Sequence, residues 1–166
     1  LYLTRAQRQG LATDVHPLLA TRGPPGTHDV ALGCDVLDAL REGRGAVLPR
    51  FDKLADDRVP DSAWARVDGH MDLVLFEGWC LKAEPEDEAA LVAPLNTLER
   101  EEDADGRWRR YCNHALRRDY PALWSRIDAL WFLQPPGFEV VRTWRDLERR
   151  AGIDAFVSRG AWDRPG

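Results

Sequence analysis

The chain has 166 residues, of which 44% are hydrophobic and 31% are charged, the size and composition of one soluble globular domain. Its net charge of -5 gives no overall attraction to nucleic acid or to an anionic membrane, so we expect neither as a partner. Three cysteines, Cys34, Cys80 and Cys112, lie far apart, without the paired spacing of a zinc site. They indicate reduced thiols in a cytoplasmic protein and not a disulfide framework.

The chain begins with Leu1 and not with Met, and we expect the parent protein to have further residues upstream. Thr4 and Gln7 form a T-x-x-Q capping box, in which each side chain accepts a hydrogen bond from the other residue's backbone N–H. A helix is predicted to follow, because apolar residues recur at helical spacing, and Gly23 is predicted to end it. Its apolar stripe consists of Leu11, Val15, Leu18 and Leu19.

The next segment, Gly23 to Asp29, has the sequence GPPGTHD. Its Pro and Gly residues restrict the backbone and hold His28 and Asp29 at the start of a second helix. Either Thr27 or Asp29 can simply cap that helix, without a further role. The helix is predicted to run from Val30 to the glycines at 43 and 45.

A short strand at 46–48 leads into the charged loop 49–58, PRFDKLADDR. A charge run of this kind is usually solvated surface. Here, however, it follows a strand, which is the position from which α/β enzymes bind their ligands. The cations of the loop are Arg50, Lys53 and Arg58, and its acids are Asp52, Asp56 and Asp57.

Four consecutive apolar residues, Leu73 to Phe76, predict a strand buried on both faces of a parallel sheet. Glu77 follows directly. Ligands of open α/β sheets bind at the carboxyl ends of the strands, so Glu77 is a candidate residue of a metal or phosphate site. A core strand followed by a turn with an incidental acid explains the same residues equally well.

The second half is predicted to contain acidic helices over 84–105, a basic and aromatic segment over 108–124, a strand at 129–133 and a last helix over 137–150. Interleaved Arg and aromatic residues can stack on nucleic acid. The acidic block beside them makes intramolecular packing and ion pairs the better interpretation. Strands that alternate with helices predict an α/β fold with a parallel sheet, in a single domain over 1–166.

Several motifs, in this order, resemble those of P-loop kinases of the uridine kinase, phosphoribulokinase and pantothenate kinase group, and most closely those of D-glycerate 3-kinases. They are LYLTRAQR, HPLLATRGPPGTHDVALG, LPRFDKLADDR, VLFEGWC, LNTLEREEDADGRWRRYCN and VVRTWR. The resemblance covers 1–150, and the tail 151–166 diverges from it. It implies a P-loop NTPase-like fold with a three-layer parallel sheet flanked by helices. The implied activity is ATP-dependent phosphoryl transfer to a hydroxyl of D-glycerate or a similar small hydroxy acid.

The resemblance also implies roles for single residues. Glu77 would help to hold the Mg²⁺ that bridges the ATP phosphates, and Arg145 resembles a lid arginine that stabilises charge on those phosphates. Asp29 would hold acceptor hydroxyls, with His28 close by. Tyr2 belongs to a motif whose preceding acid is the usual general base, and that acid is not in this chain.

The loop 49–58 would supply positive charge for the acceptor's carboxylate and for the transferred phosphoryl group. The implied contributors are Arg50, Lys53 and Arg58, and Asp52 would orient these cations or the substrate. A basic loop with one hydroxyl-binding Asp would also serve pantothenate or a sugar. Only the whole set of motifs favours glycerate.

One motif of these kinases is missing. No G-x-x-x-x-G-K-[ST] sequence occurs in the chain, so the loop that cradles the ATP phosphates is absent. We therefore expect an internal piece of a kinase that is unstable and inactive as an isolated chain, with an unpaired apolar edge inside its sheet. The alternative is a complete, non-catalytic remnant that has lost its nucleotide site and still recognises a small carboxylate.

Overall fold

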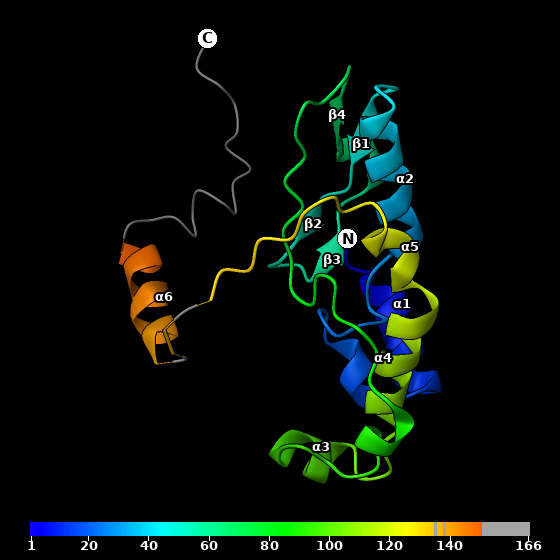
Figure 1. The fold of residues 1–166 in the computed structure, drawn as a ribbon, viewed down its shortest axis with the longest axis vertical. Coiled ribbons are helices and arrows are strands. Elements are labelled where there is room, and N and C mark those ends of the chain that lie inside the picture. The colour runs from blue at the N-terminus through cyan, green and yellow to red at the C-terminus, as the bar shows by residue number, and fades with distance from the viewer. Residues whose placement is uncertain (135, 138, 151–166) are drawn as a thin grey trace. The chain divides into compact units, whose positions relative to one another are not determined.

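The computed structural model describes residues 1–134, 136–137 and 139–150. Leu1–Asp128 and Ala129–Gly166 form two compact units, and each is described by itself (Figure 1). Every strand found in the described part of the chain belongs to the first unit. The candidate site residues up to position 77 therefore lie in the first unit, and Arg145 lies in the second.

The first unit opens with helix α1 (Arg5–Asp14), whose capping box forms as predicted. The Gln7 N–H donates to Thr4 Oγ1 at 3.3 Å, and the Thr4 N–H donates to Gln7 Oε1 at 2.8 Å. The helix ends earlier than predicted, because a proline at 17 cannot continue an α-helical hydrogen-bond ladder. Residues Pro17–Ala20 form the short 3₁₀ helix η1 instead.

Helix α2 (Val30–Arg41) begins at Asp29, whose Oδ1 accepts the Leu32 N–H at 3.1 Å, so this cap is confirmed. The helix ends before Gly43, which has a φ of +67° that glycine adopts without strain. Strand β1 (Ala46–Leu48) follows. Together these elements bury a small core of Ala39, Leu40 and Ala46, against which Val36, Leu48, Val67 and Met71 pack.

The described residues form two small antiparallel sheets and not the predicted parallel one. The pairs are β1 with β4 (Ala65–Val67) and β2 (Phe51–Asp52) with β3 (Asp57–Arg58). A short 3₁₀ helix, η2 (Asp61–Ala63), lies between β3 and β4. The three-layer parallel sheet is therefore a wrong prediction for this part of the chain.

The two segments predicted as buried strands are not paired with any described strand. Residues 73–76 and 129–133 belong to no strand, and no backbone hydrogen bond joins 73–78 to another described segment. Leu75 is 86% exposed, and Trp131 is also 86% exposed. A strand is stable only when its N–H and C=O groups find partners, and no described segment supplies them.

Helices α4 and α5 complete the packing of the first unit. Ala115 on α4 is 3% exposed, and Tyr120 and Leu123 on α5 are 2% exposed. The acidic region predicted as helical over 84–105 is helical in only two short pieces. The helical segments are η3 (Glu88–Leu91), α3 (Thr97–Glu102), α4 (Arg107–Arg118) and α5 (Tyr120–Trp124).

The second unit contains helix α6 (Val140–Arg150), which begins at 140 and not at the predicted position 137. Trp144 and Leu147, on its predicted apolar face, are 49% and 56% exposed. The predicted tail, 151–166, lies outside the described residues. In the described part of the chain no helix has the length and apolar character needed to cross a membrane.

Candidate functional site

An ion pair between Asp29 and Arg58 joins the segments that were predicted to bind a substrate. Arg58 Nη1 and Nη2 each donate to Asp29 Oδ2 at 3.1 Å, and Nη2 also donates to the Tyr2 carbonyl oxygen at 2.8 Å. The Arg58 and Asp29 side chains are 13% and 25% exposed. A shielded, doubly bonded pair is stronger than an ion pair in open solvent. It therefore holds the first residues of the chain, the start of α2 and strand β3 together.

The hairpin of β2 and β3 places Arg58 next to Tyr2. Phe51 lies opposite Arg58 across the hairpin, and the Tyr2 and Phe51 rings meet edge to face with centroids 5.1 Å apart. Asp52, predicted to orient cations or substrate, closes the turn. Its Oδ1 accepts two backbone N–H groups of the turn, at 2.8 and 3.1 Å. These bonds hold the pKa of Asp52 below its ordinary value.

A second charged cluster, which the sequence analysis did not single out, fastens the hairpin to α1. Arg8 is 0% exposed and donates to Asp56 Oδ2 at 2.7 Å and to the Asp56 carbonyl oxygen at 2.8 Å. Arg22 pairs with the same carboxylate, and its guanidinium lies 5.6 Å from the Phe51 ring centroid. The acids of LADDR look alike in sequence, so only the backbone course shows that Asp56 faces these arginines.

Tyr2 and His28 lie side by side where the start of the chain runs antiparallel to the GPPGTHD loop. Two backbone hydrogen bonds, of 2.9 and 2.8 Å, join residues 1–3 to residues 27–29. The Tyr2 and His28 ring centroids are 5.4 Å apart. The structure thus brings together four of the predicted site residues: Tyr2, His28, Asp29 and Arg58.

His28 is a half-buried imidazole bound to a tyrosine that is distant in sequence. Its Nδ1 lies 2.7 Å from the Tyr120 hydroxyl. Burial, with a smaller contribution from the N-terminal ammonium, lowers the pKa of His28 to about 4. The side chain is therefore uncharged at pH 7 and adds no positive charge to the site.

The remaining predicted residues are less constrained. Arg50 and Lys53 are exposed, and neither side chain forms a hydrogen bond or ion pair with a described residue. Arg50 lines a recess of about 10 Å³ together with Tyr2 and Arg58. Glu77 is exposed and has no bond to the Asp29–Arg58 pair. Arg145 lies on α6, and its side chain is outside the described residues.

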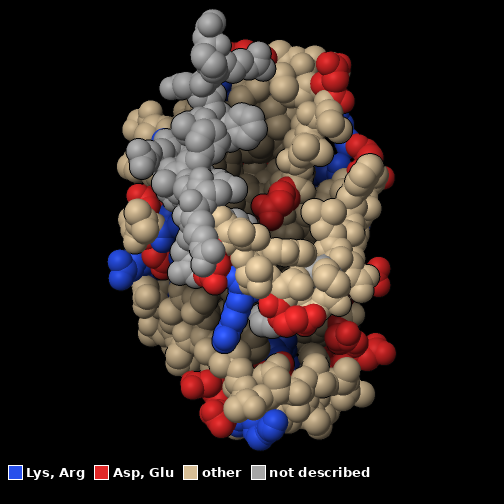
Figure 2. All heavy atoms as spheres, turned by 90° about the vertical axis from the view of Figure 1, so that its left-hand side faces the viewer, with Lys and Arg blue, Asp and Glu red and all other residues tan. Residues whose placement is uncertain are grey.

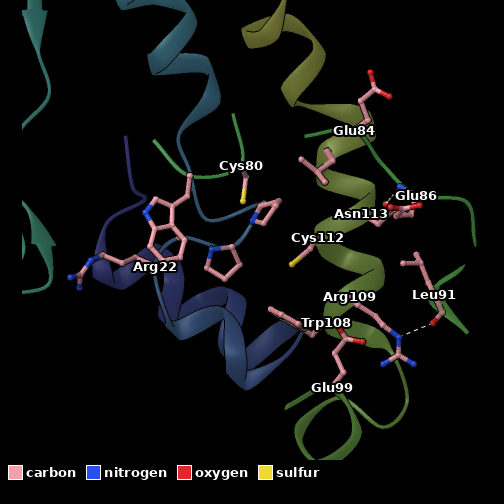
Figure 3. A pocket seen from close by; sticks show the side chains of 15 residues that line it. Arg22, Cys80, Glu84, Glu86, Leu91, Glu99, Trp108, Arg109, Cys112 and Asn113 are labelled. Atoms are coloured by element: carbon pink, nitrogen blue, oxygen red, sulfur yellow. Dashed lines mark hydrogen bonds between the residues drawn. The ribbon is translucent and has the colours of Figure 1, made fainter. Parts of the chain in front are cut away.

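A larger cavity of about 410 Å³, which no sequence motif indicated, opens beside α4 (Figure 3). Its lining is mainly apolar and includes Trp108 and the sulfur atoms of Cys80 and Cys112. Burial raises the pKa of Cys112 to about 12, so this thiol is not a nucleophile at neutral pH. The cavity can accept an apolar group, but Cys112 cannot attack it.

The basic and aromatic segment makes intramolecular contacts, as predicted. Arg109 is 7% exposed, and its Nη1 donates to Asp103 Oδ2 at 2.9 Å. Further ion pairs join Arg107 to Asp105 and Arg118 to Asp119. On the face drawn in Figure 2, the described Lys and Arg side chains do not gather into a continuous patch. Packing and ion pairs therefore account for these arginines.

One group of described side chains has donor atoms close enough to hold a metal ion. The atoms of His16, Asp103 and Asp105 lie within 4.8 Å of one another. Both carboxylates are already paired with arginines. His16 Nδ1 accepts the N–H of Leu18, which leaves the proton of a neutral ring on Nε2, the atom nearest Asp103. Metal binding at Nε2 would move this proton to Nδ1 and break the bond from Leu18, so we assign this group a structural role.

Known proteins place these features in context. No family model matches the chain. The protein named "Uncharacterized kinase mug58" of Schizosaccharomyces pombe is 31% identical over 177 residues, which cover 98% of this chain and 60% of that protein. The chloroplastic D-glycerate 3-kinase of Arabidopsis thaliana is 40% identical over 76 residues, which cover 41% of this chain and 17% of that protein.

The solved structure of the D-glycerate 3-kinase from Cryptococcus neoformans superimposes with a TM-score of 0.68 and 28% identity, over 95% of this chain and 63% of that one. This chain is related to the D-glycerate 3-kinases. The resemblance stated from the motifs is confirmed, and the relatives support the α/β class alone, without the P-loop NTPase-like parallel sheet. The chain spans 60% of the mug58 protein and 63% of the cryptococcal enzyme.

The relation to D-glycerate 3-kinases does not by itself assign roles to residues. The gathering of Tyr2, His28, Asp29 and Arg58 is compatible with the implied acceptor site, and their roles stay predictions. Sequence reasoning missed the groups that hold this cluster in place, above all Arg8, Asp56 and Tyr120. Asp56 and Tyr120 are separated from their partners by 48 and 92 residues, and no local pattern reports a contact over such a distance.

Proposed function

We propose that this chain forms the acceptor side of an ATP-dependent kinase that transfers a phosphoryl group to a hydroxyl of D-glycerate. The observation that carries the proposal is the Asp29–Arg58 pair, which is held against Tyr2 and His28 beside the exposed Arg50. The names of the relatives support a kinase of this type.

Asp29 keeps the capacity to accept one substrate hydroxyl. A carboxylate offers about four acceptor positions on its two oxygens. In the structure Oδ2 accepts two N–H groups of Arg58, and Oδ1 accepts the N–H of Leu32. A hydroxyl that donates to the remaining position would be held in a fixed orientation. Positioning of this kind is a major part of catalysis in phosphoryl transfer.

The exposed cations suit the charged parts of the reaction. Arg50 and Lys53 have no ion pair with a described residue, so they are available to a substrate carboxylate or to the transferred phosphoryl group. Arg58 differs from them, because its two terminal nitrogens already bind Asp29 and the Tyr2 carbonyl. In this proposal Arg58 orients Asp29, and Arg50 and Lys53 contact the substrate.

ATP and Mg²⁺ are the proposed cofactors. Bound Mg²⁺–ATP supplies the phosphoryl group and reduces its negative charge. Glu77 would provide one oxygen ligand to the metal, which usually binds one or two carboxylates and otherwise phosphate oxygens and water. Among the described residues, Glu77 belongs to no group of three or more His, Cys, Asp or Glu side chains placed to hold a metal ion. Arg145 would stabilise charge on the phosphates.

We also propose a cytoplasmic location and small-molecule partners. All three cysteines, Cys34, Cys80 and Cys112, are free thiols, as in a reducing compartment. The net charge of -5 gives no overall attraction to nucleic acid or to an anionic membrane.

A second candidate is a binding module without catalysis. It is favoured by one observation, the absence of a G-x-x-x-x-G-K-[ST] sequence from the 166 residues. Such a module would keep the Asp29 cluster and its affinity for a small hydroxy acid, and it would transfer no phosphoryl group.

The test combines binding and turnover. An NMR titration of the 166-residue chain with D-glycerate measures binding, and ³¹P NMR with Mg²⁺–ATP measures phosphoglycerate formation by the chain and by the product of its complete coding sequence. We expect binding by both, and turnover by the second alone. Asp29→Asn keeps a capping residue and should weaken binding about tenfold, the value of one hydrogen bond. Asp35→Asn, an exposed acid on the same helix, is the matched control.

Each outcome selects one proposal. Phosphoglycerate formation that depends on Asp29 supports the kinase. Binding of D-glycerate without turnover by either polypeptide supports the binding module. Absence of binding, or equal binding by Asp29→Asn and Asp35→Asn, contradicts the acceptor site that both share.

A further inference from the structure

The Tyr120 hydroxyl lies between the GPPGTHD loop and the ring of His28. It accepts the Gly26 N–H at 2.9 Å and lies 2.7 Å from His28 Nδ1. Tyr120 itself is 2% exposed on α5, so this hydroxyl is shielded from water. Tyr120 is separated from His28 by 92 residues, and no predicted site motif includes it.

The positions of the protons follow from counting donors. Gly26 N–H can only donate, so the Tyr120 oxygen is its acceptor. If His28 Nδ1 also donated, the phenolic proton would need an acceptor elsewhere, and no other acceptor for it is found among the described residues. A buried donor without a partner is unfavourable. Tyr120 O–H therefore donates to Nδ1, and the proton of the neutral ring lies on Nε2.

The Nε2 atom of the His28 ring is neither paired with a described residue nor fully buried. Nε2 has no hydrogen-bond partner in the described part of the chain. Trp108 Nε1 is the one fully buried side-chain atom without a partner among the described residues, so His28 Nε2 is not fully buried. The ring adjoins Tyr2, which lines the recess with Arg50 and Arg58. The N–H at Nε2 is thus without a partner among the described residues, in a ring that lies against Tyr2, whose carbonyl oxygen binds Arg58.

We propose that Tyr120 is a positioning residue that holds His28 as the Nε2–H tautomer, so that His28 donates a hydrogen bond to an oxygen of the hydroxy-acid acceptor. This inference rests on the proposed function, because it assigns a donor to the same acceptor site. It gives His28 a defined part: His28 is neither a cation for the carboxylate nor the base for the hydroxyl. The burial that lowers the pKa of His28 to about 4 agrees with a neutral ring.

Heteronuclear NMR of the imidazole nitrogens in the 166-residue chain tests the tautomer without any activity. We expect a protonated Nε2 and an unprotonated Nδ1 at pH 7 in the unmodified chain. In Tyr120→Phe we expect a mixture of tautomers, because the donor to Nδ1 is gone. Tyr111→Phe is the matched control, since the Tyr111 hydroxyl donates to the Gly26 carbonyl at 3.4 Å and does not touch His28. A proton on Nδ1 in the unmodified chain, or a change of tautomer in Tyr111→Phe equal to that in Tyr120→Phe, overturns the proposal.

Substitution of His28 tests what the Nε2 proton does. In His28→Gln the side-chain amide can occupy the place of Nε2, whereas in His28→Asn it occupies the place of Nδ1. We expect D-glycerate affinity within about threefold of the unmodified chain for His28→Gln and a loss of about tenfold for His28→Asn, the value of one hydrogen bond. Tyr120→Phe should lose only about twofold, because the Nε2–H tautomer stays partly populated. Equal losses in the two His28 variants overturn the proposal.

The two proposals fail in different ways. If D-glycerate leaves the Nε2 resonance of His28 unchanged while it binds, Tyr120 and His28 have no part in acceptor recognition and this inference is overturned. If D-glycerate shifts the Nε2 resonance but no phosphoglycerate forms with the complete coding sequence, the inference holds and the kinase proposal fails. Thermal denaturation of Tyr120→Phe, compared with Tyr111→Phe, verifies that both variants are folded.

Discussion

Two regions were predicted to belong to one site: the cluster of Tyr2, His28, Asp29 and Arg58, and the segment 73–78. Contacts within the structure hold the first region in place and not the second. In the cluster, side chains and backbone are joined by bonds of 2.8 to 3.1 Å, and Arg58 is 13% exposed. In the segment, no backbone group is bonded to another described segment, and Leu73 and Leu75 are 75% and 86% exposed.

The difference shows which parts of a site are self-sufficient. The cluster uses an N-cap, a hairpin of two short strands and arginines with several donors, and all of these lie within residues 1–60. Tyr120, which contacts His28, is the exception. The segment has the composition of an interior strand, and a strand of this kind depends entirely on its neighbours. The acceptor side of the proposed kinase can therefore be organised while the segment that carries Glu77 has no partner among the described segments.

The largest loss of stability is expected from Arg8→Met, which removes the hydrogen bonds that fasten the β2–β3 hairpin to α1. Arg8 is 0% exposed and its guanidinium donates to four oxygens, two of them in Asp56. We expect a loss of about 3–5 kcal/mol in the free energy of unfolding, because partners are left without their donor. Urea denaturation measures it. Arg5→Met, an exposed residue of the same helix, should cost no more than about 0.5 kcal/mol. Similar losses in both variants would contradict this account.

The next largest effect is a pH dependence of the free energy of unfolding, which originates at His28. Its pKa is lowered from 6.5 to about 4 in the folded chain. Between these values the unfolded chain binds a proton that the folded chain does not, so the free energy of unfolding falls as the pH falls, by about 3 kcal/mol at most. Urea denaturation at pH 7 and pH 4.5 measures the fall, which should shrink in His28→Gln. If the fall is unchanged in His28→Gln, the pH dependence of stability does not originate at His28.

A smaller loss is expected from Gly26→Ala, at the loop that presents His28. Gly26 has a φ of +89°, and a Cβ there would lie 2.5 Å from Tyr111 Cε1. We expect a loss of about 2 kcal/mol from the strained backbone and the overlap with α4. The control is Gly10→Ala in α1, where no atom lies within 4 Å, and it should stabilise the chain by about 0.5–1 kcal/mol. Thermal denaturation of the two variants should therefore shift in opposite directions.

The smallest effect on stability is expected in the exposed segment. Leu75→Lys should change the free energy of unfolding by no more than about 0.5 kcal/mol, because the side chain is 86% exposed. It should reduce self-association in sedimentation velocity, since a charge blocks pairing of a bare apolar edge. Leu19→Lys, at a position that is 0% exposed, should unfold the chain. A large loss of stability in Leu75→Lys would mean that this segment is packed in solution.

Much of the local structure could be predicted, and the reasons are visible in single residues. The capping box of Thr4 and Gln7, the cap at Asp29 and the helix of 30–41 depend on residues three or four positions apart. The first helix was predicted too long, because the apolar spacing of Leu18 and Leu19 outweighed the proline that precedes them. The candidate site residues were chosen by motif, and the structure brings four of them together.

The sequence by itself determined the starts of the helices at Thr4 and Asp29 and the relation to D-glycerate 3-kinases, because caps and motifs are written in neighbouring residues. Only the tertiary structure decided which partner each site residue has: Arg58 for Asp29, 29 residues away, and Tyr120 for His28, 92 residues away. It also decided that Leu73 to Phe76 is not a strand. An apolar run favours burial and strand pairing, and the segments that surround it determine whether it forms a strand.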